Sequence, residues 1–132
     1  MKKLARGLFA GAAAAAALTL AAGPVSAHHS TAMFHWDQEE TLSGTIESFE
    51  YTNPHSWIWF LVPDASGKPV RYGIEGMSPN GLTRNGWTKN TLKPGDHVKM
   101  VIHPLKDTTN HGGFCVSVTF EDGKTMRQLG AA

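Results

Sequence analysis

The sequence has little cysteine, little excess charge of either sign and no long apolar run after residue 22. Its one cysteine, Cys115, cannot form an internal disulfide, so we expect the hydrophobic core alone to stabilise the folded domain. No nucleophile elbow, glycine-rich phosphate loop, HExxH or C-x-x-C motif is present. These absences argue against the common hydrolase, nucleotide-binding and thiol-redox classes, and the sequence predicts a protein that is not an enzyme.

The first 27 residues contain the parts of a secretory signal peptide. Lys2, Lys3 and Arg6 form a basic start, residues 8–22 form an apolar run rich in alanine, and Val25-Ser26-Ala27 supplies the small residues that a signal peptidase accepts. The apolar run is short for a bilayer span, which needs roughly 20 residues. We therefore expect cleavage after Ala27 in a bacterial Sec-type pathway. The mature protein is then expected in the periplasm or outside the cell, without a transmembrane segment.

The mature chain has no basic surplus. Removal of residues 1–27 leaves 105 of the 132 residues, enough for one domain. The signal carries three of the twelve basic side chains, so nine remain against eleven acidic ones. Because nucleic acid is bound mainly through its phosphates by basic surfaces, we expect no nucleic-acid partner.

Strand-like patterns occupy most of the mature chain. We expect an irregular arm at residues 28–40 followed by a β-barrel domain at residues 41–132. A short helix should start at Ser78-Pro79-Asn80, with serine as the cap and proline in the first turn. The predicted strands are residues 41–51, 56–62, 69–76, 97–103 and 114–120, with a further short strand or tail at 125–129.

This order of elements, all-β with one short helix, is typical of a small five-stranded Greek-key barrel of the OB type. A change of apolar parity in the first strand predicts a bulge near Glu47 and Ser48. The strand at 56–62 is apolar on both faces, so we expect the core on one side and the arm on the other. An open two-sheet sandwich remains the alternative.

Other alternations predict which side chains face the core. In the third strand, Arg71, Gly73 and Glu75 are expected to point outward. In the short helix Leu82 is expected to face the core, and after the helix Trp87 is expected to do the same. In the last long strand, Cys115 falls on the polar side and is expected to be partly exposed. The inward residues of that strand are then Phe114, Val116, Val118 and Phe120.

Four spaced motifs carry a resemblance to a known family. They are Ala27-His28-His29-Ser30; Asn53-Pro54-His55 with Trp57; Ser78-Pro79-Asn80-Gly81-Leu82 with Gly86-Trp87; and Leu92-Lys93-Pro94-Gly95-Asp96 with His103-Pro104. Together they resemble the DUF6152 family of small exported bacterial proteins of unknown function. The likeness spans nearly the whole mature chain. It implies a signal peptide and a compact β domain, and it brings no established activity with it.

Cleavage after Ala27 would make His28 the first residue of the mature protein. Its α-amino nitrogen and its ring Nδ1 then chelate one metal ion, and the low pKa of an α-amino group, about 8, makes proton displacement easy. Such nitrogen ligands favour Cu(II). A further nitrogen is needed, and the candidates are His29, His55, His103 and His111. The alternative is that these adjacent histidines lie on a polar terminus and bind nothing.

The chelate resembles the N-terminal histidine arrangement of copper oxygenases and of some periplasmic copper carriers. Copper binding is therefore the first functional hypothesis. A copper-dependent oxidase is the exception to the prediction that the protein is not an enzyme.

The second hypothesis is a metal-free interaction module that docks a periplasmic partner protein or a small ligand. Its candidate surface consists of Trp36, Trp57 and Trp59, since exposed aromatic side chains on small barrels act as stacking platforms. The alternative is that these tryptophans, with Trp87, fill the core of a domain that has no disulfide. The sequence pattern favours core packing and does not decide between the two.

Overall fold

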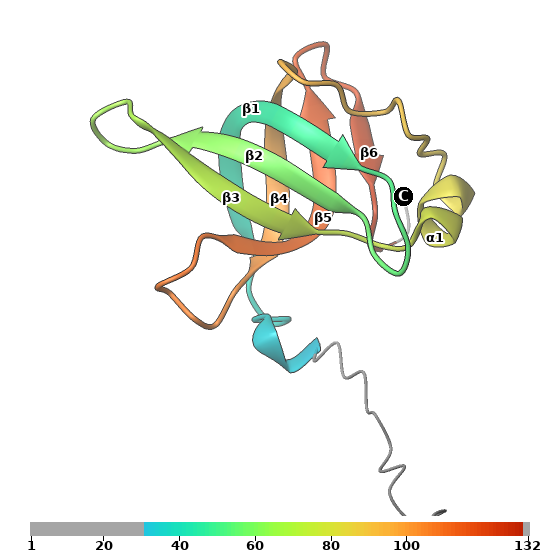
Figure 1. The fold of residues 1–132 in the computed structure, drawn as a ribbon, viewed down its shortest axis with the longest axis horizontal. Coiled ribbons are helices and arrows are strands. Elements are labelled where there is room, and N and C mark those ends of the chain that lie inside the picture. Colours follow the sequence, from blue (N-terminus) through green and yellow to red (C-terminus); the bar gives the residue numbers. More distant parts are fainter. Residues whose placement is uncertain (1–30, 131–132) are drawn as a thin grey trace, which may run out of the picture. The chain divides into compact units, whose positions relative to one another are not determined.

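One short helix and six strands follow one another in residues 31–130, the part of the chain that the computed structural model describes (Figure 1). The predicted signal peptide, His28 and His29 lie outside these residues. The elements are the 3-10 turn η1 (Thr31–Met33), β1 (Glu40–Glu50), β2 (Trp57–Pro63), β3 (Pro69–Glu75), α1 (Pro79–Arg84), β4 (His97–Pro104), β5 (Gly112–Phe120) and β6 (Thr125–Arg127).

The first five strands close into a barrel. Antiparallel pairs join β1 to β2, β2 to β3, β1 to β4 and β4 to β5. Parallel pairing of β3 with β5, from Gly73 opposite Gly112 to Glu75 opposite Phe114, closes the ring. The predicted OB-like barrel is confirmed, and the sandwich is wrong because that pairing leaves no gap between two sheets. The additional β6 pairs with β5.

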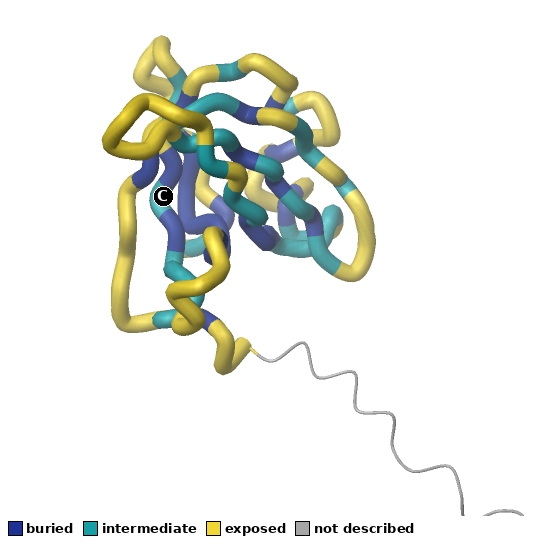
Figure 2. Tube along the Cα trace, turned by 60° about the vertical axis from the view of Figure 1, so that its left-hand side comes forward, coloured by how far each residue is buried: buried dark blue, intermediate teal, exposed yellow. Residues whose placement is uncertain are grey.

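The bulge predicted in β1 is confirmed. The register between β1 and β2 shifts between Ile46 and Ser48, so Glu47 is the extra residue. Because of the bulge, Ile46 before it and Phe49 after it both pack on the core although they differ in parity. Buried segments of all five barrel strands converge on the interior, whereas the connecting loops are exposed (Figure 2). Fully buried members of this core include Ile58, Phe60, Ile74, Leu82, Met100, Ile102, Cys115 and Val118.

Helix α1 covers one end of the core, close to the C-terminal end of the described chain (Figure 1). Its start follows the predicted chemistry: Ser78 Oγ accepts a hydrogen bond from the Gly81 amide, and proline occupies the first turn. Leu82 and Trp87 are buried as predicted, and the Trp87 indole N–H donates to the Arg127 carbonyl at 3.0 Å. That bond connects Trp87, just after α1, to the last residue of β6.

Strand β5 departs from the prediction. The register with β4 passes from Val101 opposite Ser117 to Ile102 opposite Cys115, so Val116 is a bulge residue. The bulge reverses the inward face, which places Cys115 in the core with none of its surface exposed. The prediction of a partly exposed cysteine is wrong, as is the prediction that Phe114 and Val116 face the barrel interior. Both are buried against other parts of the chain instead.

The arm does not cover β2. Phe34 pairs with Leu105, and the His35 amide donates to the Pro104 carbonyl at 2.9 Å. The Phe34 ring also packs edge-on against Phe114, with centroids 5.7 Å apart. The arm therefore packs over the end of β4 and the start of β5, and the outer face of β2 carries its own apolar side chains without it. The prediction that the arm lies over β2 is wrong.

Barrel closure requires glycine at the start of β5. A Cβ atom at Gly113 would lie 2.6 Å from the His103 carbonyl oxygen and 2.8 Å from Ile102 Cδ1. Because the carbonyl belongs to the β4–β5 ladder, we expect Gly113→Ala to lower the free energy of unfolding by about 2–3 kcal/mol. Urea denaturation measures the loss. Gly67→Ala, at a turn residue with φ of 83° and open space around it, should cost about 1 kcal/mol. An equal loss in both variants would contradict the packing argument.

Candidate ligand-binding face

Two tryptophans stand side by side on the outer surface of β2. The strand alternates, and since Ile58 and Phe60 are fully buried in the core, Trp57 and Trp59 point outward. Both are only partly buried. Their ring centroids lie 6.1 Å apart and their planes are within 17° of parallel. The two indoles therefore form one continuous aromatic strip on the barrel wall.

Trp59 is fixed from three sides. Its indole N–H donates to Glu50 Oε1 at 2.7 Å, and the Arg71 guanidinium carbon lies 3.8 Å from the ring centroid. Gly73 is opposite Trp59 on β3, and a Cβ there would lie 2.9 Å from the ring. Glycine thus allows the indole to rest against β3. Arg71 is held in turn by Glu47, whose Oε2 accepts from Nε at 2.6 Å.

Trp57 has fewer contacts. Among residues 31–130, Trp59 is its one aromatic neighbour and no cation lies over its ring. Trp57 faces Glu75 across the β2–β3 ladder. We define Trp57, Trp59 and Arg71, with the Glu50 and Glu75 carboxylates, as the aromatic face. Within it Trp59 is held by Glu50 and Arg71, whereas no cation of residues 31–130 covers the Trp57 ring.

A histidine–carboxylate pair borders the aromatic face. His55 lies in the loop between β1 and β2, after a cis Asn53–Pro54 peptide bond, and its Nδ1 contacts Glu75 Oε1. Glu75 is buried, with 5% of its surface exposed, so a polar partner is what makes its burial tolerable. The pair fixes the orientation of the His55 ring, which is itself about a third exposed, with a side-chain value of 31%.

Trp36 does not belong to this face. It lies in the arm, is 42% exposed, and donates its indole N–H to the Thr31 carbonyl. Its ring contacts His103 and Phe114 at centroid distances of 5.0 and 5.3 Å. The structure thus brings together two of the three tryptophans predicted as a platform. The third forms a separate cluster with the arm.

The predicted metal ligands are dispersed. His55 bonds to Glu75, His103 Nδ1 lies 2.7 Å from the Gln38 carbonyl, and the His111 ring packs on Tyr72 with centroids 5.1 Å apart. Within residues 31–130, no three His, Cys, Asp or Glu side chains are grouped so that they could hold a metal ion. His28 and His29 are outside that range, so copper binding through them stays a prediction.

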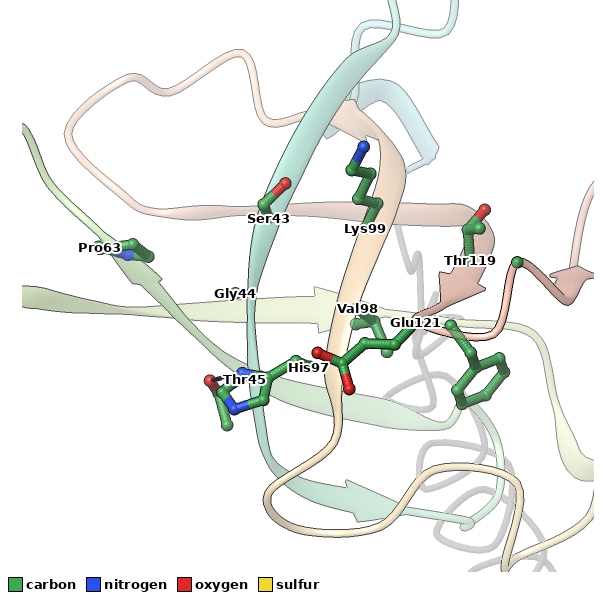
Figure 3. Close-up of a pocket in the computed structure, with 11 residues that line it drawn as sticks. Ser43, Gly44, Thr45, Pro63, His97, Val98, Lys99, Thr119 and Glu121 are labelled. Atoms are coloured by element: carbon green, nitrogen blue, oxygen red, sulfur yellow. Dashed lines mark hydrogen bonds between the residues drawn. The ribbon is translucent and has the colours of Figure 1, made fainter.

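A concave surface, separate from the aromatic face, lies where β1, β4 and the end of β5 meet (Figure 3). This open groove has a volume of about 640 Å³, and within it Thr45 Oγ1 lies 2.9 Å from His97 Nδ1. Figure 3 shows the Glu121 carboxylate on the same side as His97, with the Lys99 side chain directed away from both. His97, Lys99 and Glu121, which line the groove, are all exposed.

Burial in the core raises the pKa of the Cys115 thiol, so the folded protein holds its proton more tightly than the unfolded chain does. The unfolded thiol ionises near pH 8.5. Above that pH the unfolded state binds fewer protons, and the free energy of unfolding should fall by up to about 1.4 kcal/mol per pH unit. Denaturation at pH 8 and pH 10 measures the difference. The Cys115→Ala variant should lose this part of the alkaline dependence, and an unchanged slope would contradict the assignment.

The fold and the site together define a class: a small OB-like barrel with an outward aromatic pair on β2. The family model described as "Family of unknown function (DUF6152)" matches residues 15–114, and the chain belongs to that family. Comparison with curated proteins gave no match, and comparison with solved structures gave none. Within residues 31–130 no helix has both the length and the apolar character to cross a bilayer.

The residues that orient the tryptophans were not predicted as part of a site. Alternation in the third strand correctly placed Arg71 and Gly73 outward, whereas Glu75, on the same side of the ladder, is buried against His55. No sequence signal paired these residues with β2. The one clue in the sequence is that Trp57 and Trp59 share a parity within a single strand. Trp36 lies outside that strand, so the same clue separates it from the pair.

Proposed function

We propose that this protein is an exported binding module that takes its ligand on the aromatic face, without a metal. The observation that carries the proposal is the near-parallel Trp57–Trp59 pair, directed outward from β2 and partly exposed. Export rests on the predicted signal peptide of residues 1–27. The expected compartment is the bacterial periplasm or the exterior.

Leaving part of a large aromatic side chain in water costs free energy. Apolar surface in water is unfavourable by roughly 25 cal/mol per Å², so a ligand that covers the exposed part of the two indoles recovers that cost. The Trp59 contacts with Glu50 and Arg71 hold the pair in one geometry before any ligand arrives. Such preorganisation reduces the ordering cost of binding.

Fold-level analogy points to the same surface. OB-type barrels bind their ligands on the face of the second and third strands, between the loop that precedes β2 and the loop that precedes β5. In this chain that face carries Trp57 and Trp59 on β2 and Arg71 on β3, and His55 lies in the first of those loops. The shared fold suggests where a ligand binds, whereas the residues of the face decide which ligand it is.

The indole N–H signals of the four tryptophans test the location directly. We expect a library of small organic fragments and simple sugars to perturb the signals of Trp57 and Trp59 in a ¹⁵N-labelled sample. Trp36, in the arm, and Trp87, in the core, serve as internal controls and should not move. Perturbation confined to Trp36, or to the groove of Figure 3, would remove the basis of the proposal.

We also propose copper as a second candidate ligand, at a different place. The observation that favours it is the pair of adjacent histidines directly after the predicted cleavage site at Ala27. Cleavage there gives His28 a free α-amino group next to its imidazole, a chelate that suits Cu(II). The two proposals are independent, because the aromatic face does not require the terminus.

A further inference from the structure

We infer that the ligand of the aromatic face is an uncharged oligosaccharide, an inference that rests on the proposed function. Three features of the face carry it: the open ring of Trp57, the carboxylates around the two indoles, and a single basic group, on Arg71, that is already paired.

The ring surface suits a sugar. An indole has an electron-rich face, and the C–H groups on one side of a pyranose ring carry partial positive charge, so the two stack favourably. Trp59 already has the Arg71 guanidinium 3.8 Å from its ring centroid, which leaves Trp57 as the more available ring. A second, nearly parallel indole 6.1 Å away extends the strip, so a ligand with more than one ring fits better than a single ring.

The polar groups around the indoles suit hydroxyls. Carboxylates accept hydrogen bonds and cannot donate them when ionised, and sugar hydroxyls are donors. Glu50 uses Oε1 for the Trp59 N–H, and its side chain is otherwise exposed at the edge of the face. His55, oriented by the buried Glu75, lies in the loop at the end of the face and is not needed for this bonding.

The charge balance excludes polyanions. The exposed Glu50 carboxylate lies beside the indoles, whereas the one guanidinium of the face, on Arg71, is paired with Glu47 and lies on Trp59. A phosphate backbone or an acidic glycan would meet net negative charge, and binding to such ligands depends on basic groups. Nucleic acids stack on aromatic platforms too, but they also need a positively charged groove.

A protein partner fits less well. A stable protein interface buries about 800 Å² on each side around an apolar centre from which charged residues are depleted. Here, exposed Glu47, Glu50 and Arg71 surround the two indoles closely. A narrow aromatic strip with polar edges suits a ligand that stacks its rings on the indoles and bonds its hydroxyls at the edge.

Calorimetric titration of the mature protein tests the inference. The probes are three neutral oligosaccharides (β-1,4-linked glucose, β-1,4-linked N-acetylglucosamine and α-1,4-linked glucose), an acidic oligogalacturonate and a single-stranded DNA oligomer. We expect binding of at least one neutral oligosaccharide and of neither polyanion. Glu50→Gln keeps an acceptor for the Trp59 N–H but removes the charge, and should weaken that binding about fivefold. Trp36→Ala, outside the face, should leave it unchanged.

The outcomes separate the inference from the proposed function. If no neutral oligosaccharide binds while fragments or another probe still perturb Trp57 and Trp59, the inference is overturned and the aromatic face stands as a binding site. The inference is likewise overturned if DNA or oligogalacturonate binds there more tightly. If nothing perturbs either indole, both fail.

Discussion

Replacing Trp57 with alanine is expected to weaken ligand binding by about five- to 150-fold while leaving the folded state almost unchanged. Loss of a stacked aromatic contact costs about 1–3 kcal/mol of binding free energy. Trp57 is partly exposed, and Trp59 is its one aromatic neighbour among residues 31–130. We therefore expect its removal to lower the free energy of unfolding by less than about 1 kcal/mol. Calorimetric titration with the tightest-binding probe and urea denaturation give the two values.

Trp59→Ala provides the contrast. It removes the bond to Glu50, the contact with Arg71 and the packing against Gly73, so it should lower both affinity and stability. Trp36→Ala should leave the affinity unchanged, since that ring packs on His103 and Phe114. Equal loss of affinity in the Trp36 and Trp57 variants would show a general effect of removing tryptophan and would contradict a specific role for Trp57.

Adding one alanine before His28 is expected to weaken Cu(II) binding by two or more orders of magnitude, if copper is a ligand of the mature terminus. The extra residue moves the α-amino group away from the histidine ring and destroys the two-nitrogen chelate. The visible d–d band and the paramagnetic signal of a nitrogen-rich site report the binding. Mass spectrometry of the exported protein must first show His28 as residue one.

Equal and weak copper binding by the two forms would remove the copper proposal. His28→Ala with the native terminus measures the contribution of the ring to copper binding, because it keeps the α-amino group and deletes Nδ1. The aromatic face is unaffected by either result. Binding at Trp57 in the presence of a chelator would show that the two functions are separate.

Local patterns were enough to predict the barrel. The parity change in residues 41–51 indicated the bulge that β1 contains at Glu47, and Ser78-Pro79 marked the start of α1. These features depend on neighbouring residues alone, so a single chain displays them. The order of elements favoured an OB-type barrel and left a sandwich open, and the β3–β5 pair that closes the ring is a finding of the structure.

The bulge in β5 could not be predicted. Phe114, Cys115 and Val116 are each suited to a buried position, so a one-residue shift at Val116 leaves no change in the pattern. Cys115 was assigned to the wrong face for that reason. The tertiary structure decides what covers the outer face of β5. Phe34 from the arm packs against Phe114 on that face.

The aromatic face was predictable only in part. Trp57 and Trp59 share a parity, but the apolar character of β2 on both sides concealed which parity faces the core. Their partners come from other strands, and the cross-strand register that places Gly73 opposite Trp59 is a property of the folded sheet. The His55–Glu75 pair joins residues twenty positions apart through the same register.

The most direct test of the central claim is a structure of the protein with a bound neutral oligosaccharide, by crystallography or from intermolecular NOEs. We expect a sugar ring stacked on Trp57, with carbon atoms within about 4 Å of the indole, and a hydroxyl bonded to the exposed Glu50 carboxylate. A ligand seated in the groove of Figure 3 or against Trp36, with the Trp57 ring still exposed to solvent, would contradict it.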